Sequence, residues 1–222
     1  MKPTKGSVEL SLLVVLGVFL VNAQPGEKCS TRIAELYPRQ MLDLDQMVGE
    51  WMGIQMAWRD SSLVTPQWAK CASQFFSRQN DSINLNIILK YDLTTTGKHV
   101  ERVGQIDIGE HPSHSHWRKW FYEDPSRWWE EVVIATDYKN YWIQYECEIN
   151  NDGIRVETVV MRARTRTITQ TEKEIYESIV EGLGFPPANF VGVPQPINCG
   201  HANSTTGKVE AKKPLWWTPD FY

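Results

Sequence analysis

Eight short β-rich segments follow one another through most of the chain, and their regular spacing limits the folds that it can adopt. They are expected at residues 49–59, 69–78, 83–91, 98–108, 116–122, 129–136, 140–149 and 153–165. The links between them are of hairpin length, and turn-forming residues such as Asn150, Asp152 and Gly153 fill them. No helical pattern separates these segments, which argues against a parallel α/β sheet. The spacing predicts an all-β fold, either an up-and-down barrel or a sandwich.

One amphipathic helix is predicted after the last of these segments. Thr169 and Glu172 have the spacing of a capping box, which marks a helix start. The apolar side chains expected on one face are Ile175, Ile179, Val180 and Leu183. Gly184 and Pro186 then prevent the helix from continuing. A helix that follows a complete set of strands is expected to lie against their outer surface.

The first 23 residues are typical of a signal peptide. Lys2 and Lys5 precede an apolar stretch at residues 10–21, which is shorter than the roughly 20 residues that span a bilayer. Ala23 ends a small-x-small cleavage pattern, so the mature, secreted chain is expected to begin at Gln24. The alternative interpretation of this stretch is a short membrane anchor. We expect one domain at 24–200 and a polar tail at 201–222.

Charge and composition exclude some partners. The formal net charge is −4, and the basic residues are not clustered. Nucleic-acid binding needs a basic face, so it is not predicted, and no anionic membrane surface is implied. Two Asn-x-Ser/Thr sequences, at Asn80 and Asn203, are candidate glycosylation sites.

The four cysteines are even in number, which in an oxidising compartment indicates two disulfides. They are Cys29, Cys71, Cys147 and Cys199. Four cysteines allow three pairings, and their spacing does not choose among them. A zinc site made by all four is disfavoured because no two of them have the close spacing of such sites.

Two motifs resemble those of the lipocalins, small barrels that carry apolar molecules. Gly49 and Trp51 form the first, after the segment 43–48. The second is the segment 135–147. The match is closest to the apolipoprotein D and insect bilin-binding branch and extends over about residues 29–200. The resemblance implies an eight-stranded antiparallel up-and-down barrel with one open end, and with one C-terminal α-helix packed on the outside.

The resemblance also implies specific contacts. It pairs Cys29 with Cys147 and Cys71 with Cys199. Trp51 would plug the closed end of the barrel, with Gly49 allowing close approach of the N-terminal segment and Arg164 lying over the indole. Because Arg162 and Arg166 alternate with Arg164, the identity of the stacking arginine stays open.

Asp137 and Tyr138 are expected at the same closed end. Asp137 is expected to cap a turn there and to hold the tip of the N-terminal segment. The alternative role, a catalytic carboxylate, has no partner acid or base close in sequence.

Alternation along the last two strands predicts the side chains that face inward. If Cys147 lies outside the barrel, Trp142, Gln144 and Glu146 point inside. An inward Arg164 likewise makes Thr158, Val160 and Arg162 inward. Glu146 and Arg162 could then form an internal ion pair, or one of them could reach solvent, and the sequence leaves both open.

The predicted ligand-binding residues of the cavity and its mouth are therefore Trp58, Trp68, Trp142, Gln144, Thr158, Val160 and Arg162. Trp58 and Trp68 flank the first loop, which in the resembled family overhangs the open end. His111, His114 and His116 form a histidine-rich loop. Only Glu110 lies near enough in sequence to complete a metal site, so a solvated loop is preferred.

The function expected is reversible carriage of a small hydrophobic ligand, such as a bilin, retinoid, sterol or fatty acid, without a cofactor and without enzymatic activity. No phosphate loop or Gly-x-Ser-x-Gly motif occurs. Two alternatives remain: a protein-interaction module with a vestigial cavity, and an isomerase-type enzyme on the same fold. A receptor or a second copy of the chain also remains open as a partner.

Overall fold

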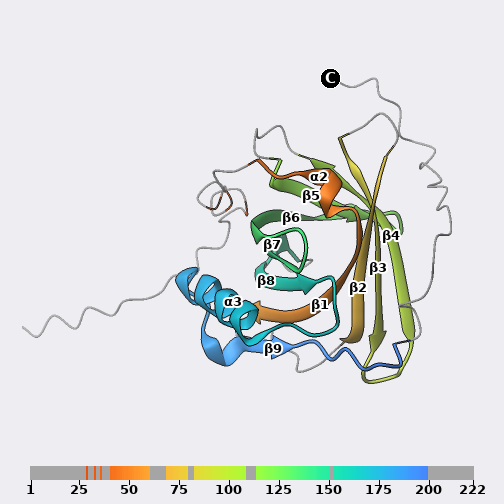
Figure 1. Cartoon of the computed structure of the whole chain (residues 1–222). Helices are drawn as coiled ribbons and strands as arrows, with labels where there is room; N and C mark the ends of the chain where they lie inside the picture. The colour runs from red at the N-terminus through yellow and green to blue at the C-terminus, as the bar shows by residue number, and fades with distance from the viewer. Residues whose placement is uncertain are drawn as a thin grey trace, which may run out of the picture.

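The computed structural model describes residues 29, 33, 36, 41–60, 69–79, 83–108, 114–150 and 153–199. Its first eight strands are β1 Gly49–Trp58, β2 Ala69–Arg78, β3 Leu85–Leu93, β4 His99–Ile108, β5 His116–Phe121, β6 Asp124–Thr136, β7 Tyr141–Ile149 and β8 Arg155–Ala163. Each pairs antiparallel with the next, and β1 pairs with both β2 and β8, so that the sheet closes on itself (Figure 1). The predicted barrel is confirmed, and the sandwich is excluded.

One boundary differs from the sequence-based expectation. Asp124 and Pro125 were expected in a turn, but β6 begins at Asp124, and the chain reverses at Tyr122 and Glu123. The reason is cross-strand pairing: Trp128 lies opposite Trp120 in the β5–β6 ladder. Cross-strand pairing stabilises a sheet, and here it extends the strand through a local turn signal.

A ninth strand, β9 (Phe190–Gly192), was not predicted. It pairs with the second half of β1, whose pairing with β2 ends at Met52. Just after β9, Gln195 Nε2 donates to the Gly53 and Ala72 carbonyl oxygens, at 2.8 Å each. One side chain thus bridges β1 and β2 where they separate, and the C-terminal segment completes this part of the barrel wall.

The predicted helix is α3, Gln170–Gly182, and it packs outside the barrel (Figure 1). Thr169 and Glu172 form both halves of its capping box. Its buried side chains are Tyr176 and Val180, and the Tyr176 hydroxyl donates to the Val159 carbonyl oxygen at 3.1 Å. The remaining predicted apolar positions, Ile175, Ile179 and Leu183, are partly buried against the same cluster.

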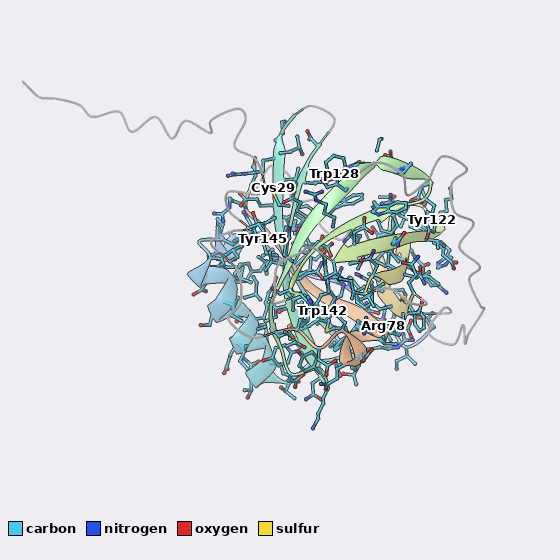
Figure 2. The ribbon with its side chains drawn as sticks, turned by 90° about the horizontal axis from the view of Figure 1, so that it is seen from above. Cys29, Arg78, Tyr122, Trp128, Trp142 and Tyr145 are labelled. Atoms are coloured by element: carbon cyan, nitrogen blue, oxygen red, sulfur yellow. A yellow bond between two sulfur atoms is a disulfide. The ribbon has the colours of Figure 1, made fainter. Side chains whose placement is uncertain are left out.

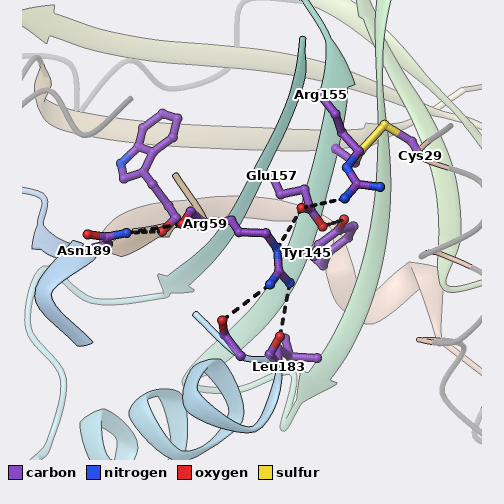
Figure 3. Close-up of polar contacts among 10 residues, drawn as sticks. Cys29, Arg59, Tyr145, Arg155, Glu157, Leu183 and Asn189 are labelled. Carbon is purple, nitrogen blue, oxygen red and sulfur yellow. Dashed lines mark hydrogen bonds and ion pairs between the residues drawn. A yellow bond between two sulfur atoms is a disulfide. The ribbon is translucent and has the colours of Figure 1, made fainter. Parts of the chain in front are cut away.

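Arg59 joins the end of α3 to the barrel at the start of the loop that follows β1. Its side chain donates to the carbonyl oxygens of Leu183, at 3.1 Å, and Gly184, at 3.4 Å (Figure 3). Its Nε lies 2.7 Å from Glu157 Oε2 on β8, and the Tyr145 hydroxyl donates to the other oxygen of Glu157 at 2.5 Å. A carboxylate held in this way by a cation and a hydroxyl can be buried without a large penalty.

Two separate cores follow from the alternation of the strands. The inner core fills the closed end, where the short helix α2 (Leu44–Met47) covers Trp51 and Trp142. The outer core lies between the barrel wall and α3 and contains Tyr145. Trp142 and Tyr145 therefore lie on opposite faces of β7 (Figure 2).

Both disulfides implied by the resemblance are present, between Cys29 and Cys147 and between Cys71 and Cys199. They span 118 and 128 residues of sequence. In the chain-entropy model, closing a loop of this length stabilises the fold by about 4.7 kcal/mol. The first fixes the N-terminal segment to β7, and the second fixes the C-terminal segment to β2.

Gly104 on β4 offers a direct test of the close approach between β4 and β5. A Cβ atom there would lie 2.9 Å from Phe121 Cα and closer still to the Trp120 carbonyl oxygen. We expect Gly104→Ala to destabilise the protein by at least the roughly 1–3 kcal/mol typical of overpacked cores, because backbone atoms must move. Chemical denaturation measures this. Gly192→Ala in β9, where a Cβ would meet nothing within 4 Å, is the matched control. Equal stability losses in the two variants would contradict the prediction.

Several sequence-based predictions lie outside the described residues. They concern the signal peptide at 1–23, the tail at 201–222, Trp68, His111, and the glycosylation sites Asn80 and Asn203. All of these stay predictions. Within the described part of the chain, no helix has the length and apolar character needed to cross a membrane.

Candidate functional site

A cavity of about 230 Å³ occupies the barrel on the side away from α2. Most of its wall is apolar. The main apolar contributors are Met56, Trp58, Leu89, Phe121, Val156 and Val160. The charged residues at its surface are Arg102, Lys119, Glu146, Glu148 and Arg162.

The predicted cavity residues fall into two groups. Trp58, Thr158, Val160 and Arg162 are at the cavity surface. Trp142 and Gln144 point into the barrel as expected, but they lie beneath the cavity and do not line it. Trp142 is packed edge-on against Phe76 and Trp117, with ring centroids 5.6 and 5.7 Å apart. Aromatic rings packed edge to face fill the barrel up to the level of Trp142, and this raises the floor of the cavity.

A cluster of four charged side chains forms part of that floor. Arg162 Nη2 lies 3.2 Å from Glu146 Oε1, so the hypothesised internal ion pair is present. Arg162 is only 7% exposed, which excludes the alternative in which it reaches solvent. Lys119, 4% exposed, extends the pair: its Nζ lies 3.5 Å from the same Glu146 oxygen and also contacts Glu131 Oε1.

Sequence reasoning missed Lys119 and Glu131. Glu131 is fully buried, and its Oε2 accepts a hydrogen bond from Trp117 Nε1 at 2.6 Å. Alternation places Lys119 on the same strand face as Trp117. That Glu131 lies opposite Glu146 follows from the β6–β7 register, which no local pattern gives. Two facing carboxylates repel each other, and Lys119 between them compensates this.

The two carboxyl groups differ in their pKa. Burial raises the pKa of Glu131, and the nearby Lys119 charge offsets this effect only in part. Burial also pushes the pKa of Glu146 upward, but the Lys119 and Arg162 charges outweigh it and leave the pKa below its usual value. Glu146 is therefore the firmly ionised member of the cluster, and Glu131 is the one that holds a proton more readily.

Aromatic rings and cations alternate along the upper wall. The Arg102 guanidinium lies 3.9 Å from the centre of the Phe121 ring and 5.4 Å from that of Trp129. Arg127 stands 5.1 Å from the same indole and pairs with Glu148 at 2.7 Å. Such contacts hold the long side chains of this part of the wall against its aromatic rings.

The closed end has the geometry that the resemblance implied. The Arg164 guanidinium lies 3.6 Å from the centre of the Trp51 ring system, which identifies Arg164 as the stacking arginine. Arg164 also donates to the carbonyl oxygens of Gln46, at 2.7 Å, and Glu50, at 3.1 Å. Gly49 has φ +102, and a Cβ there would lie 3.0 Å from Arg164 Nη1. The positive φ therefore favours glycine, and a larger side chain would also have to displace the Arg164 guanidinium.

Asp137 caps its turn, and among the residues that the structure describes its hydrogen bonds all stay within that turn. Its carboxylate accepts hydrogen bonds from the backbone N–H groups of Lys139, Asn140 and Tyr141. Burial raises the pKa of Asp137, but these donors outweigh burial and the net pKa is lowered. The contact with the N-terminal segment is made by Tyr138, whose hydroxyl oxygen accepts from the Asp43 N–H at 3.0 Å.

Catalytic and metal-binding alternatives have little support from these contacts. All four cysteines are in disulfides, so a thiol nucleophile is not available. Within the described ranges no cluster of three or more His, Cys, Asp or Glu side chains could hold a metal ion. Of the histidine-rich loop, His116 lies 3.8 Å from Glu130.

Comparison with known proteins agrees with this geometry. The family model described as "Lipocalin / cytosolic fatty-acid binding protein family" matches residues 125–196. No curated protein sequence matches the chain.

Among solved structures, apocrustacyanin C2 superposes with a TM-score of 0.59 at 17% identity, covering 75% of this chain and 87% of that chain. Lobster apocrustacyanin A1 superposes with a TM-score of 0.57 at 16% identity, covering 73% of this chain and 85% of that chain. The siderocalin Ex-FABP, which functions through dual ligand specificities, superposes with a TM-score of 0.53 at 14% identity. The match covers 69% of this chain and 93% of that chain. At these identities the likeness concerns the fold.

Proposed function

We propose that this chain, whose residues 125–196 match the lipocalin family model, is a secreted carrier that binds one small, mainly apolar molecule reversibly in its barrel cavity. The observation that carries the proposal is the cavity itself: about 230 Å³ of space within an apolar wall. A barrel filled by its own side chains would instead favour the protein-interaction alternative.

Desolvation supplies the driving force for such binding. Each Å² of apolar surface removed from water contributes about 25 cal/mol. The costs of association reduce this sum, so micromolar to nanomolar affinity is expected. The volume lies below the roughly 300–1,000 Å³ of ordinary ligand pockets. A compact ligand therefore fits better than a bilin or a sterol, which would protrude from the mouth.

Secretion is proposed on two supports. The leader at residues 1–23 has the composition of a signal peptide. The two disulfides suit an oxidising compartment, where such bonds form and persist.

Filling the cavity should abolish binding. Val160 is buried on β8 at the cavity surface, and Val160→Trp places an indole in the space that the ligand needs. We expect the affinity for the neutral fluorophore N-phenyl-1-naphthylamine to fall at least about tenfold, because most of the apolar contact area is lost. Fluorescence titration measures this change, and the wild-type protein should bind one probe per chain.

The matched control is Ile154→Trp, which adds the same side chain at a position that is 50% exposed and outside the cavity. It should bind the probe as the wild type does. Circular dichroism and thermal unfolding establish that both variants are folded. A folded Val160→Trp variant that binds the probe as tightly as the wild type would refute the carrier proposal. A wild-type protein that binds neither the probe nor a ten-carbon acid, alcohol or amine would refute it as well.

A further inference from the structure

The charged floor presents two cationic side chains to the cavity. Lys119 and Arg162 together carry eight N–H donors, and both side chains are at the cavity surface. Glu146 Oε1 is the shared partner of three donors, which come from Lys119, Arg162 and Gln144. Arg162 Nη1 is buried and has no hydrogen-bond partner among the residues that the structure describes. A buried, unpaired donor of a charged group is costly, and an acceptor from a ligand would relieve that cost.

The two cations are also held side by side. Both contact a single oxygen of Glu146, at 3.5 Å from Lys119 and 3.2 Å from Arg162. Their remaining N–H groups can therefore converge on one acceptor group. Carboxylates with two oxygens suit this arrangement, because hydrogen bonds between ionised partners are about twice as strong as neutral ones.

Resting on the proposed carrier function, we propose that the ligand is a compact organic acid whose carboxylate sits on Arg162 and Lys119 and whose apolar body extends toward Trp58. The apolar residues Leu89, Val156 and Val160 form the wall that surrounds this body. The small volume excludes full burial of a large ring system, whereas a medium-length chain or a single aromatic ring fits.

Other head groups fit this floor less well. An ammonium group would approach two cations, and the nearest carboxylate oxygen of Glu146 already accepts from three donors. A hydrocarbon would leave Arg162 Nη1 unpaired while excluding water from it. An alcohol offers one neutral oxygen, so it should bind more weakly than an acid of the same length.

The test compares ligands that differ only in the head group. Calorimetric titration of the wild-type protein with decanoate, 1-decanol and decylamine at neutral pH measures the head-group preference at constant chain length. We expect decanoate to bind about tenfold or more tightly than 1-decanol, because its head group is ionised. Decylamine should be the weakest of the three.

Variants identify the groups responsible. Arg162→Met should reduce the preference for decanoate over 1-decanol to threefold or less, whereas Arg162→Lys, which keeps a partner for Glu146, should retain part of it. The matched control is Arg118→Met, which removes a cation from an exposed position on the same strand as Lys119 and should preserve the wild-type preference.

The outcomes separate this inference from the carrier function. If 1-decanol and decanoate bind equally to the wild type, or if decylamine binds best, the carboxylate assignment is wrong while the carrier function stands. If Arg118→Met loses the preference as Arg162→Met does, the effect comes from overall charge, and the assignment is again wrong. If none of the three ligands nor the neutral fluorophore binds, the carrier function itself fails.

Discussion

Trp51→Ala is expected to lower the free energy of unfolding by about 3–5 kcal/mol, the range for large aromatic residues truncated in a core. Trp51 is fully buried at the closed end, with its ring centroid 6.1 Å from that of Trp142. Its Nε1 donates to the Met47 carbonyl oxygen at 2.8 Å, and Arg164 covers its face. The truncation therefore leaves a cavity, an unstacked guanidinium and an unpaired carbonyl at one place.

Urea denaturation followed by circular dichroism measures this loss. The matched control is Trp128→Ala, which removes the same side chain from a position that is 51% exposed on β6 (Figure 2). Its cost should be below about 1 kcal/mol, since little buried area is lost. A similar loss in both variants would show that Trp51 does not act as the plug of the barrel.

Lys119→Met should destabilise the protein by a comparable amount, about 3–5 kcal/mol, because it breaks a buried ion pair from one side. The change leaves Glu131 fully buried without its cation and removes one of two cations from Glu146. Adding Glu131→Gln to this variant should recover more than half of the loss. The amide oxygen can still accept from Trp117 Nε1, while the uncompensated charge is gone.

The pH dependence of this effect distinguishes charge from packing. The raised pKa of Glu131 means that the folded state binds more protons than the unfolded state above the usual value of 4.5. Stability from this group therefore falls as the pH rises from about 4.5 through the folded-state pKa. Without Lys119 the pKa of Glu131 rises further. The loss in free energy of unfolding of Lys119→Met relative to the wild type should therefore be smallest near pH 4.5 and should grow toward neutral pH.

Denaturation of both variants across this pH range measures the trend. The double variant has no carboxyl at position 131, so its deficit should vary less with pH. A deficit of Lys119→Met that is constant with pH would show that lost packing, and not the charge of Glu131, is responsible.

Much of the barrel followed from local patterns. Alternation placed Trp142, Gln144 and Glu146 on the face of β7 that points into the barrel. The capping pair Thr169 and Glu172 marked the start of the helix. The closed-end roles of Gly49 and Trp51 came from the family resemblance, which left Arg162, Arg164 and Arg166 open as the stacking arginine. These features depend on neighbours in sequence or on one repeated period, which the chain displays directly.

The cavity was less predictable. Alternation shows which face of a strand a side chain occupies, but it does not show how far up the barrel the core extends. Trp142 was therefore expected at the cavity surface, although its packing against Phe76 and Trp117 places it beneath. β9 was missed for a similar reason, since three residues that pair with β1 beyond its ladder with β2 carry no periodic signal.

The amino-acid sequence by itself determined where the strands and the late helix lie and which side chains share a strand face, because hydrophobic periodicity and turn chemistry act over a few residues. Tertiary structure alone decided that Lys119 and Glu131 join Glu146 and Arg162, and that a compact hollow remains above them. The physical reason is that charge compensation and packing depend on distances across the barrel, which closure of the sheet sets and no local pattern encodes.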